Sequence, residues 1–178
     1  MPFNILITGS PGIGKTTVLN RIKSEIARQN YDVGGVTCPE IRKNGKRVGF
    51  SIINISNNEK GILAHVKSKG PHVGRYKVNL RDLDEIGTNA IETALKNSDF
   101  IFIDEIAPME LHSKRFCSAV EAAMDSEKPV AAVIHKRSSH PFVSKIKARK
   151  DVLIFEVTHE NRDILCEEIL KDLKGFLV

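Results

Sequence analysis

The feature that most constrains the fold of this chain is a glycine-rich segment near its start, Gly9-Ser10-Pro11-Gly12-Ile13-Gly14-Lys15-Thr16. The segment fits the pattern GxxxxGK(S/T) of a phosphate-binding loop, or P-loop. Glycines allow backbone angles and a close approach to a ligand that a Cβ atom would block, so several N–H groups can converge on phosphate oxygens. Because such a loop joins a buried strand to the start of a helix, it predicts a strand–loop–helix unit of an α/β fold.

The residues on both sides of the loop agree with this prediction. Phe3 to Thr8 form a short apolar run typical of a buried parallel strand, and apolar residues recur at helical spacing from Lys15 to Gln29. Lys15 would reach the β- and γ-phosphates, and the hydroxyl of Thr16 would coordinate Mg²⁺. The predicted nucleotide-binding residues of this region are Gly9, Ser10, Pro11, Gly12, Ile13, Gly14, Lys15, Thr16 and Thr17.

The remainder of the chain alternates predicted strands with predicted helices. We expect strands at Val33–Thr37, Val48–Ile53, Tyr76–Val78, Phe100–Ile103, Val130–Ile134 and Val152–Val157. We expect helices over Leu83–Leu95 with Asp82 as N-cap, over Ser113–Asp125, and over Asn161–Leu173. This alternation predicts a three-layer α/β fold with a mainly parallel sheet, in a single domain over residues 1–178.

One region differs from this alternating pattern. Asn44-Gly45 is a strong hairpin-turn signal, because both residues tolerate positive φ. The residues on either side predict an antiparallel hairpin that extends the main sheet. The polar, glycine-punctuated segment from Ser56 to Val73 is expected to be a loop.

Two acidic residues, Asp104 and Glu105, directly follow the predicted strand Phe100–Ile103. In an open α/β sheet, ligands bind outside the carboxyl ends of the strands, so both carboxylates should face the P-loop. An apolar strand followed by an acid is the Walker B pattern. Asp104 would hold Mg²⁺ together with Thr16, and Glu105 would orient and deprotonate an attacking water. A residue that positions water favours hydrolysis, which makes Lys15 and Glu105 the leading catalytic candidates.

Composition sets limits on partners and location. The chain has 178 residues and a formal charge of +5, from 27 basic and 22 acidic side chains, which suits polyanions such as nucleotides and nucleic acids. Three cysteines without CxxC spacing fit a reducing compartment, and we find no secretory signal and no run of roughly 20 apolar residues. We therefore expect a cytoplasmic monomer without membrane association.

Three functions remain open on these residues alone. The first is Mg²⁺-dependent hydrolysis of nucleoside triphosphates. The second is a nucleotide or nucleoside kinase, which would need an acceptor site that the sequence does not reveal. The third is a nucleotide-dependent RNA- or DNA-binding ATPase, although no motif supports nucleic acid, and the absence of Trp leaves few stacking platforms. The segments NKxD and LSGGQ, which mark other P-loop classes, are absent, and no DxxG switch follows directly on the predicted strand Phe100–Ile103.

Several further segments match one family of P-loop proteins. They are Gly9 to Thr17, Gly35-Val36-Thr37, Glu40-Ile41-Arg42, Gly45 to Phe50, Val73 to Tyr76, Asp104-Glu105-Ile106, Met109-Glu110-Leu111, Val157-Thr158 and Glu160-Asn161-Arg162. Through them, and over almost its full length, the chain resembles the small cancer-related nucleoside-triphosphatase family. Ala107 stands where relatives usually carry glycine. The resemblance implies a RecA-like core and slow, Mg²⁺-dependent hydrolysis of ATP, GTP and other triphosphates to diphosphate and phosphate, with little base selectivity.

Four polar residues in these segments are secondary candidates. Arg47 and Arg75 lie near glycines, and either could act in catalysis by stabilising the charge of the γ-phosphoryl group; the alternative is a surface arginine. Asn161 and Arg162 follow the last strand, where P-loop folds often contact the base. Asn161 also suits the N-cap of the last helix, and Arg162 the surface of that helix.

Three further features have two readings each. Glu110 would position water or a basic partner, or else cap a helix. His135 follows a strand, and would either sense the γ-phosphate or simply leave the core. Lys136, Arg137 and residues 138–150 form a basic stretch that would close over the nucleotide as a lid, or remain a solvated loop and helix.

Overall fold

Five parallel strands form one half of a ten-stranded sheet in the computed structural model, which describes residues 3–176. These strands are β1 (Asn4–Gly9), β2 (Val33–Thr37), β8 (Phe100–Ile106), β9 (Val130–Ile134) and β10 (Val152–Val157). Their spatial order is β10-β1-β9-β8-β2, with parallel pairing throughout. All five coincide with predicted strands, and β8 is longer than predicted because it continues through Asp104 and Glu105.

The other half of the sheet is antiparallel and larger than the single hairpin we predicted. It comprises β3 (Glu40–Lys43), β4 (Lys46–Asn54), β5 (Lys60–His65), β6 (His72–Val73) and β7 (Tyr76–Val78). The hairpin turn at Asn44-Gly45 is confirmed, and both residues have positive φ, of 52° and 75°. The prediction of a loop over Ser56–Val73 is wrong at β5 and β6, because Leu63 and Ala64 of β5 are buried in the core beside β4.

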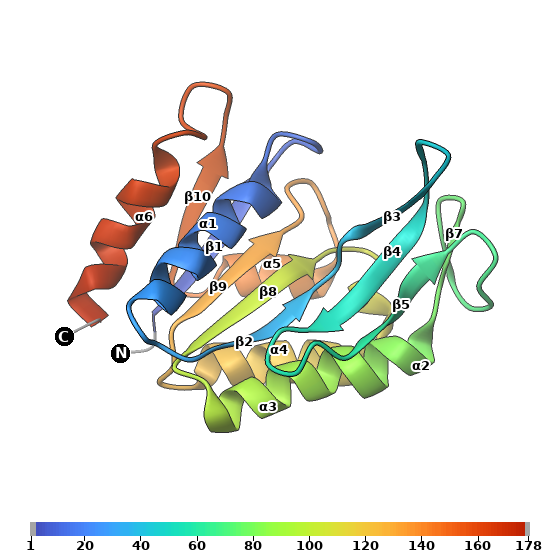
Figure 1. Ribbon diagram of the computed structural model, residues 1–178, viewed down its shortest axis with the longest axis horizontal. Helices are drawn as coiled ribbons and strands as arrows, with labels where there is room; N and C mark the ends of the chain where they lie inside the picture. The colour runs from blue at the N-terminus through green and yellow to red at the C-terminus, as the bar shows by residue number, and fades with distance from the viewer. Residues whose placement is uncertain (1–2, 177–178) are drawn as a thin grey trace.

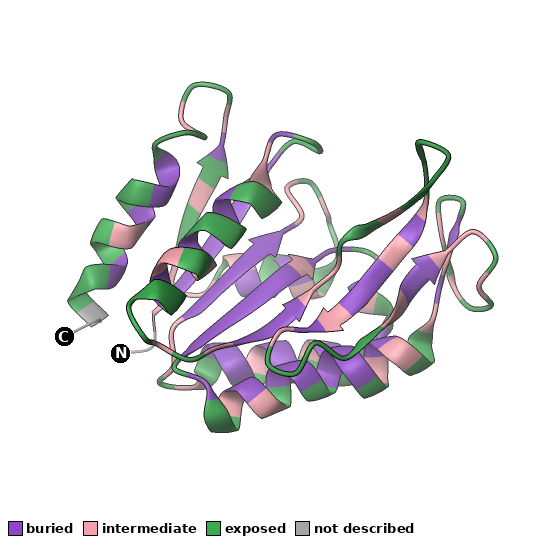
Figure 2. Ribbon diagram, in the orientation of Figure 1, coloured by how far each residue is buried: buried purple, intermediate pink, exposed green. Residues whose placement is uncertain are grey.

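Helices cover both faces of the sheet (Figure 1). On one face lie α1 (Lys15–Arg28) and α6 (Leu165–Leu173), and on the other lie α3 (Asn89–Asn97), α4 (Lys114–Asp125) and α5 (Pro141–Lys147). Figure 2 shows that the central strands are buried, whereas the outer faces of the helices are exposed. In β1, Ile5 and Ile7 pack with the α1 layer and Leu6 packs with the opposite layer, as alternation along a strand requires. The predicted three-layer α/β class is therefore confirmed, with a mixed sheet.

The helix before β8 begins earlier than the sequence predicted. It starts with α2 (Leu80–Asp82) and continues through a π-helical segment, η1 (Leu83–Thr88), into α3. The N-cap is Asn79, whose side chain accepts a hydrogen bond from the Asp82 N–H at 3.2 Å. Asp82 is therefore not the cap. Its carboxylate accepts a hydrogen bond from the Ile62 N–H at 2.8 Å instead, which ties the helix to β5.

The last helix begins later than predicted, because α6 starts at Leu165 and not at Asn161. The Asn161 side chain accepts a hydrogen bond from the Thr158 N–H and donates one to the Glu156 carbonyl, both at 2.8 Å. Asn161 therefore closes the turn after β10 and does not cap the helix.

The basic stretch over residues 138–150 forms a loop and a helix, as the second of its two readings expects. This stretch contains α5, whose Val143 and Ile146 are fully buried, so the stretch is part of the packed fold. The structure adds two short 3-10 segments, η2 (Glu110–His112) and η3 (Lys174–Phe176). Within residues 3–176, no helix has both the length and the apolar character that a membrane crossing requires.

Candidate functional site

The glycine-rich segment forms the loop between β1 and α1, as predicted. Gly12 and Gly14 have φ of 75° and 113°, values that L side chains rarely adopt, and Gly14 directly precedes the helix. The side chain of Ile13 anchors the loop, because it is buried in the core layer beneath α1. Lys15 Nζ donates a hydrogen bond to the Gly9 carbonyl at 2.9 Å, which holds the amine across the loop.

Asp104 lies opposite the loop, because β8 and β1 run parallel through β9 and end at the same edge of the sheet. The Thr16 hydroxyl donates to a carboxylate oxygen of Asp104 at 2.9 Å, so the two predicted metal ligands meet. Asp104 is only 7% exposed. Burial raises the pKa of Asp104, and the Thr16 hydrogen bond, Lys23 and Lys15 act in the opposite direction.

Glu105 follows within the same strand and lies beside Asp104 in the same cavity. Burial and the neighbouring Asp104 charge raise the pKa of Glu105 to about 7, against the opposing effect of Lys15. A carboxyl group with a pKa near neutrality can accept and release a proton close to physiological pH, which a general base requires. The chemistry that the sequence predicted for Glu105 is therefore compatible with its surroundings.

His135 lies between the loop and the acidic pair, because β9 lies between β1 and β8 in the sheet. Its backbone N–H donates to the Ile106 carbonyl at 3.0 Å. Its Nδ1 atom is buried and has no hydrogen-bond partner among the described residues. Burial, with Lys15 and Lys147, lowers the pKa of His135, so its imidazole is mainly neutral at pH 7. The side chain lines the cavity, where it can contact the γ-phosphate, which is the first of the two roles expected for it.

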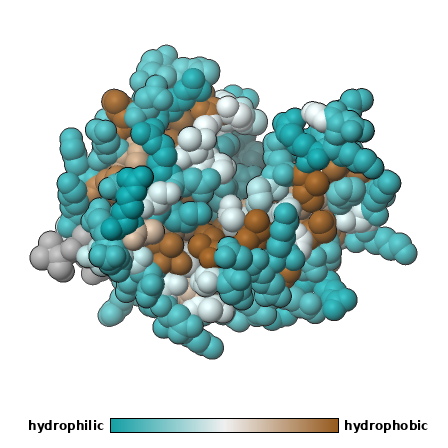
Figure 3. Space-filling view, viewed as in Figure 1, coloured by the Kyte–Doolittle hydropathy of each residue, from teal (hydrophilic) through white to brown (hydrophobic). Residues whose placement is uncertain are grey.

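A cavity of about 860 Å³ connects these groups. Figure 3 shows this side of the molecule hollowed between the α1 side and the β3–β4 hairpin. Many of the predicted catalytic, nucleotide-binding and metal-binding residues line this cavity: Gly9, Ser10, Pro11, Gly12, Lys15, Thr16, Arg47, Asp104 and Glu105. Among the secondary candidates, it is also lined by Glu110, His135, Lys136 and Arg137.

Arg47 and Arg75 occupy different positions around Tyr76. Arg47 lines the cavity and is held by hydrogen bonds to the Tyr76 hydroxyl at 2.9 Å and to Glu40 at 3.1 Å. Its guanidinium also lies 5.2 Å from the centre of the Phe50 ring. Arg75 is not among the residues that line the cavity, and its guanidinium donates to the Arg47 carbonyl and the Tyr76 hydroxyl. The geometry therefore gives Arg47 access to a ligand and gives Arg75 a bracing position.

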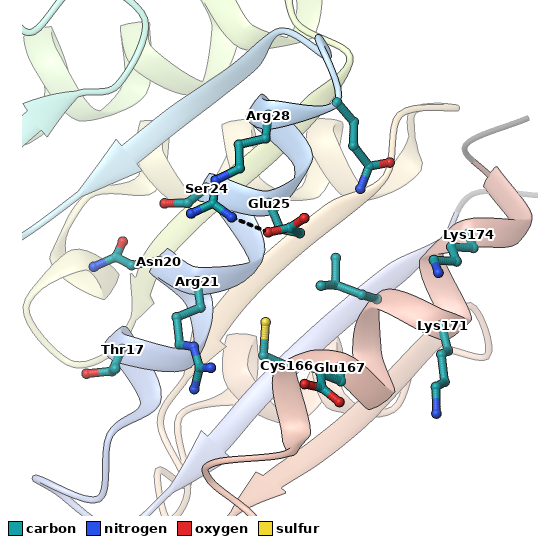
Figure 4. A pocket seen from close by; sticks show the side chains of 12 residues that line it. Thr17, Asn20, Arg21, Ser24, Glu25, Arg28, Cys166, Glu167, Lys171 and Lys174 are labelled. Atoms are coloured by element: carbon teal, nitrogen blue, oxygen red, sulfur yellow. Dashed lines mark hydrogen bonds and ion pairs between the residues drawn. The ribbon is translucent and has the colours of Figure 1, made fainter.

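Five predicted nucleotide-binding residues lie outside the cavity lining: Ile13, Gly14, Thr17, Asn161 and Arg162. Thr17 lies on α1 at a separate groove of about 840 Å³ between α1 and α6 (Figure 4). Figure 4 shows that the labelled side chains around this groove are mostly charged or polar, including an ion pair between Glu25 and Arg28 at 2.9 Å. Asn161 and Arg162 lie in the turn after β10, which pairs with β1 up to Gly9 and so ends beside the P-loop.

Sequence reasoning missed the apolar residues of the antiparallel half that line the cavity. These residues are Cys38, Pro39, Phe50, Leu63 and Val73. The position of Cys38 at the end of the predicted strand Val33–Thr37 was a signal in the sequence. Strand β2 is parallel to β8 and Thr37 pairs with Asp104, so the residue after Thr37 lies beside the acidic pair. No comparable signal existed for Phe50, Leu63 or Val73, since their proximity to the P-loop depends on how the antiparallel strands pair.

Glu110 contributes a further carboxyl group to the cavity, besides those of Glu40, Asp104 and Glu105. It is 2% exposed, and its Oε2 atom has no hydrogen-bond partner within the part of the chain that the structure describes. Burial, and then repulsion from Glu105, raise the pKa of Glu110 well above its usual range. The residue does not cap a helix, since Ser113 is the N-cap of α4 and accepts a hydrogen bond from the Phe116 N–H at 3.0 Å.

The fold and the site together define a P-loop nucleotide-binding enzyme. A family profile described as NTPase matches residues 4–170. The nucleoside-triphosphatase THEP1 of Methanopyrus kandleri is 42% identical over 178 residues, which cover 99% of this chain and 98% of the relative. The chain belongs to the THEP1 nucleoside-triphosphatase family and is a nucleoside-triphosphatase. The predicted family resemblance and enzyme class are therefore confirmed.

Other relatives support the same assignment. The nucleoside-triphosphatase THEP1 of a Thermotoga species (strain RQ2) is 50% identical over 171 residues, covering 96% of this chain and 95% of the relative. The crystal structure of THEP1 from Aquifex aeolicus has a TM-score of 0.84 at 34% identity, covering 96% of this chain and 99% of that chain. The solution structure of a human cancer-related nucleoside triphosphatase has a TM-score of 0.82 at 29% identity, covering 97% and 98%.

Proposed function

We propose that this protein hydrolyses nucleoside triphosphates in a Mg²⁺-dependent reaction with low base selectivity, and that its products are nucleoside diphosphate and phosphate. The observation that carries the proposal is the position of Glu105. Its carboxyl group lies beside the predicted metal ligand Asp104, in the cavity that also contains the P-loop lysine. A group that activates water is needed for hydrolysis and is not needed for nucleotide binding alone.

Thr16 and Asp104 suit a magnesium ion. Their side chains supply two oxygen ligands that lie 2.9 Å apart, and oxygen is the ligand that Mg²⁺ prefers. No cluster of three or more His, Cys, Asp or Glu side chains suited to a metal occurs among residues 3–176. This fits Mg²⁺, which keeps several waters and usually binds to one or two protein groups together with substrate phosphates. When bound, the ion would neutralise negative charge on the β- and γ-phosphates.

The residues of the chain then have distinct tasks. Backbone N–H groups of the P-loop bind phosphate oxygens, helped by the positive end of α1. Lys15 exchanges its hydrogen bond with the Gly9 carbonyl for one with a phosphate oxygen. Glu105 accepts a proton from the attacking water, and Arg47 stabilises the charge that spreads over the γ-phosphoryl oxygens.

Low base selectivity is supported by the state of Asn161. Both its amide oxygen and its amide nitrogen already form hydrogen bonds within the turn after β10. Asn161 is therefore occupied and offers little hydrogen bonding to a base, whereas the exposed Arg162 can stack on any base. Discrimination between bases requires hydrogen bonds that the wrong base leaves unmade.

A phosphate-release assay tests this proposal. ATP, GTP, CTP, UTP and deoxynucleotides should all be hydrolysed at similar rates with Mg²⁺, and EDTA should abolish the reaction. The kinase alternative is examined by adding nucleosides and nucleoside monophosphates to ATP labelled on the γ-phosphate. We expect the label in inorganic phosphate; label in a nucleoside product would overturn hydrolysis as the main reaction.

We further propose that the protein acts in the cytoplasm. All three cysteines, Cys38, Cys117 and Cys166, are free thiols in the structure. Free thiols persist in a reducing compartment.

A further inference from the structure

The cavity extends beyond the place where the proposed function puts the γ-phosphate. Lys15 would reach the β- and γ-phosphates and Glu105 the attacking water, so these two residues mark the end of the triphosphate. Past them, the cavity is lined by Cys38, Phe50, Leu63, Val73 and Met109. We name this apolar region the distal chamber. Figure 3 shows hydrophobic atoms on the hairpin side of the hollow.

The ribose and base of a bound triphosphate would not fill the distal chamber. They extend from the α-phosphate, at the opposite end of the chain from the γ-phosphate. The residues predicted to contact that end, Thr17, Asn161 and Arg162, are not among those that line the cavity. The base therefore leaves the chamber free.

The size of the cavity also exceeds what a triphosphate chain requires. A triphosphate has about 13 non-hydrogen atoms, which occupy at most ~400 Å³ at roughly the volume of one water molecule each. The cavity measures about 860 Å³, so about half of it remains. That remainder alone falls within the range of roughly 300–1,000 Å³ that small-molecule sites occupy.

The residues that line the chamber restrict the charge of an occupant. The whole cavity carries acidic groups (Glu40, Asp104, Glu105 and Glu110) and basic groups (Lys15, Arg47, Lys136 and Arg137), but the five residues that define the chamber are apolar, so burying a charge there would be costly and an uncharged occupant is favoured. The buried Oε2 atom of Glu110 has no partner among the described residues, and a hydrogen-bond donor on a ligand would satisfy it. At the rim, Phe50 and the guanidinium of Arg47 offer faces on which an aromatic ring can stack.

We propose that the distal chamber binds a second small molecule, an uncharged heteroaromatic compound with N–H or O–H donors of the kind that a nucleoside presents. Its ring would lie against Phe50, Leu63 and Val73, and a donor would reach Glu110. This inference rests on the proposed function only in requiring that the P-loop holds the triphosphate. It assigns a ligand to a region that hydrolysis itself does not use.

Methionine methyl NMR tests the proposal on the unaltered protein. The chain has three methionines; Met109 lines the chamber, whereas Met124 is fully buried in the core. The protein, with ¹³C-methyl methionine, is first saturated with Mg²⁺ and a non-hydrolysable ATP analogue, and adenosine, guanosine, cytidine and uridine are then titrated. We expect saturable shifts of the Met109 signal at millimolar nucleoside or below, with the Met124 signal unchanged. Absence of a Met109 shift with every nucleoside would overturn the proposal.

A pair of variants locates the bound nucleoside. Val73→Trp would fill the chamber from its half-buried rim, and Leu153→Trp, on exposed strand β10 at the opposite edge of the sheet, is the matched control. We expect nucleoside affinity to fall at least about tenfold in V73W and to be retained in L153W. Equal affinity in V73W and the wild type would contradict the location. Phosphate release should stay within about twofold of the wild type in L153W; its absence from the wild type would contradict the proposed function and not the chamber.

Discussion

At the scale of single residues, the ionisation of Glu105 connects the fold to the chemistry. Burial and the Asp104 charge raise its pKa to about 7, and Lys15 opposes this only in part. The folded protein without nucleotide therefore binds a proton at Glu105 that the unfolded chain releases between about pH 4.5 and 7. In this window the contribution of Glu105 to the free energy of unfolding falls as the pH rises.

This linkage predicts the effect of Glu105→Gln on stability. The variant removes a carboxylate that is unfavourable to ionise in the fold, so it should be more stable than the wild type at pH 8 and nearly equal at pH 5. One pKa unit corresponds to about 1.4 kcal/mol, which limits the difference at pH 8 to about 3 kcal/mol. Thermal unfolding without Mg²⁺ and nucleotide, at both pH values, measures it. An equal difference at both pH values would be evidence against a raised pKa.

Arg47 carries the second prediction at this scale. Removal of its guanidinium should lower kcat by about 10²-fold, the typical effect of losing a group that stabilises transition-state charge. Arg42→Ala is the matched control, because Arg42 also pairs with Glu40 but does not line the cavity. We expect R47A to lose activity while R42A stays within about twofold of wild type. Equal losses of kcat in both variants would mean that the loss comes from breaking the ion pairs of Glu40 in the hairpin, and not from a direct role of Arg47 in catalysis.

At the scale of elements, the cap of α4 offers a prediction that separates stability from activity. Ser113 accepts a hydrogen bond from the Phe116 N–H, and its hydroxyl also donates to Asp84. Ser113→Ala should cost about 1 kcal/mol and lower Tm by about 2–4 °C, with phosphate release unchanged. Ser118→Ala on the exposed side of the same helix should leave Tm unchanged. A loss of activity in S113A below its Tm would mean that α4 shapes the site.

The elements also show what local sequence could and could not predict. β1, β8 and β9 were predictable because each is a continuous apolar run, and the P-loop motif itself predicts the helix after β1. β5 was not, because Lys60–His65 has only two buried residues and becomes a strand by pairing with β4 and β7. Asn161 looked like an N-cap because its side chain does bond to backbone, but it does so in a turn ahead of the helix.

The same distinction applies to the candidate site. Lys15, Thr16, Asp104 and Glu105 could be predicted together because parallel strands end at one edge of the sheet. The cavity wall on the antiparallel side could not, because Phe50 and Val73 have no motif and depend on strand pairing. The choice between Arg47 and Arg75 likewise required the positions of their guanidinium groups around Tyr76.

At the scale of the whole molecule, the net charge of +5 leaves nucleic acid as an alternative partner. Binding of a single strand usually combines a basic groove with exposed aromatic rings. This chain has no Trp and two Tyr, of which Tyr76 is 7% exposed and is stacked with arginines. We expect single-stranded RNA to leave phosphate release unchanged and to bind weakly, with binding lost as salt rises. Stimulation of hydrolysis by RNA would contradict this expectation.

The measurement that tests the central claim most directly compares binding and hydrolysis in Glu105→Gln and Lys15→Ala. In E105Q, Mg²⁺ and ATP should still raise Tm, because the P-loop and metal ligands are intact, while phosphate release falls by at least about 10²-fold. In K15A both the rise in Tm and phosphate release should be lost. Wild-type phosphate release in E105Q would contradict the assignment of Glu105 as the group that activates water.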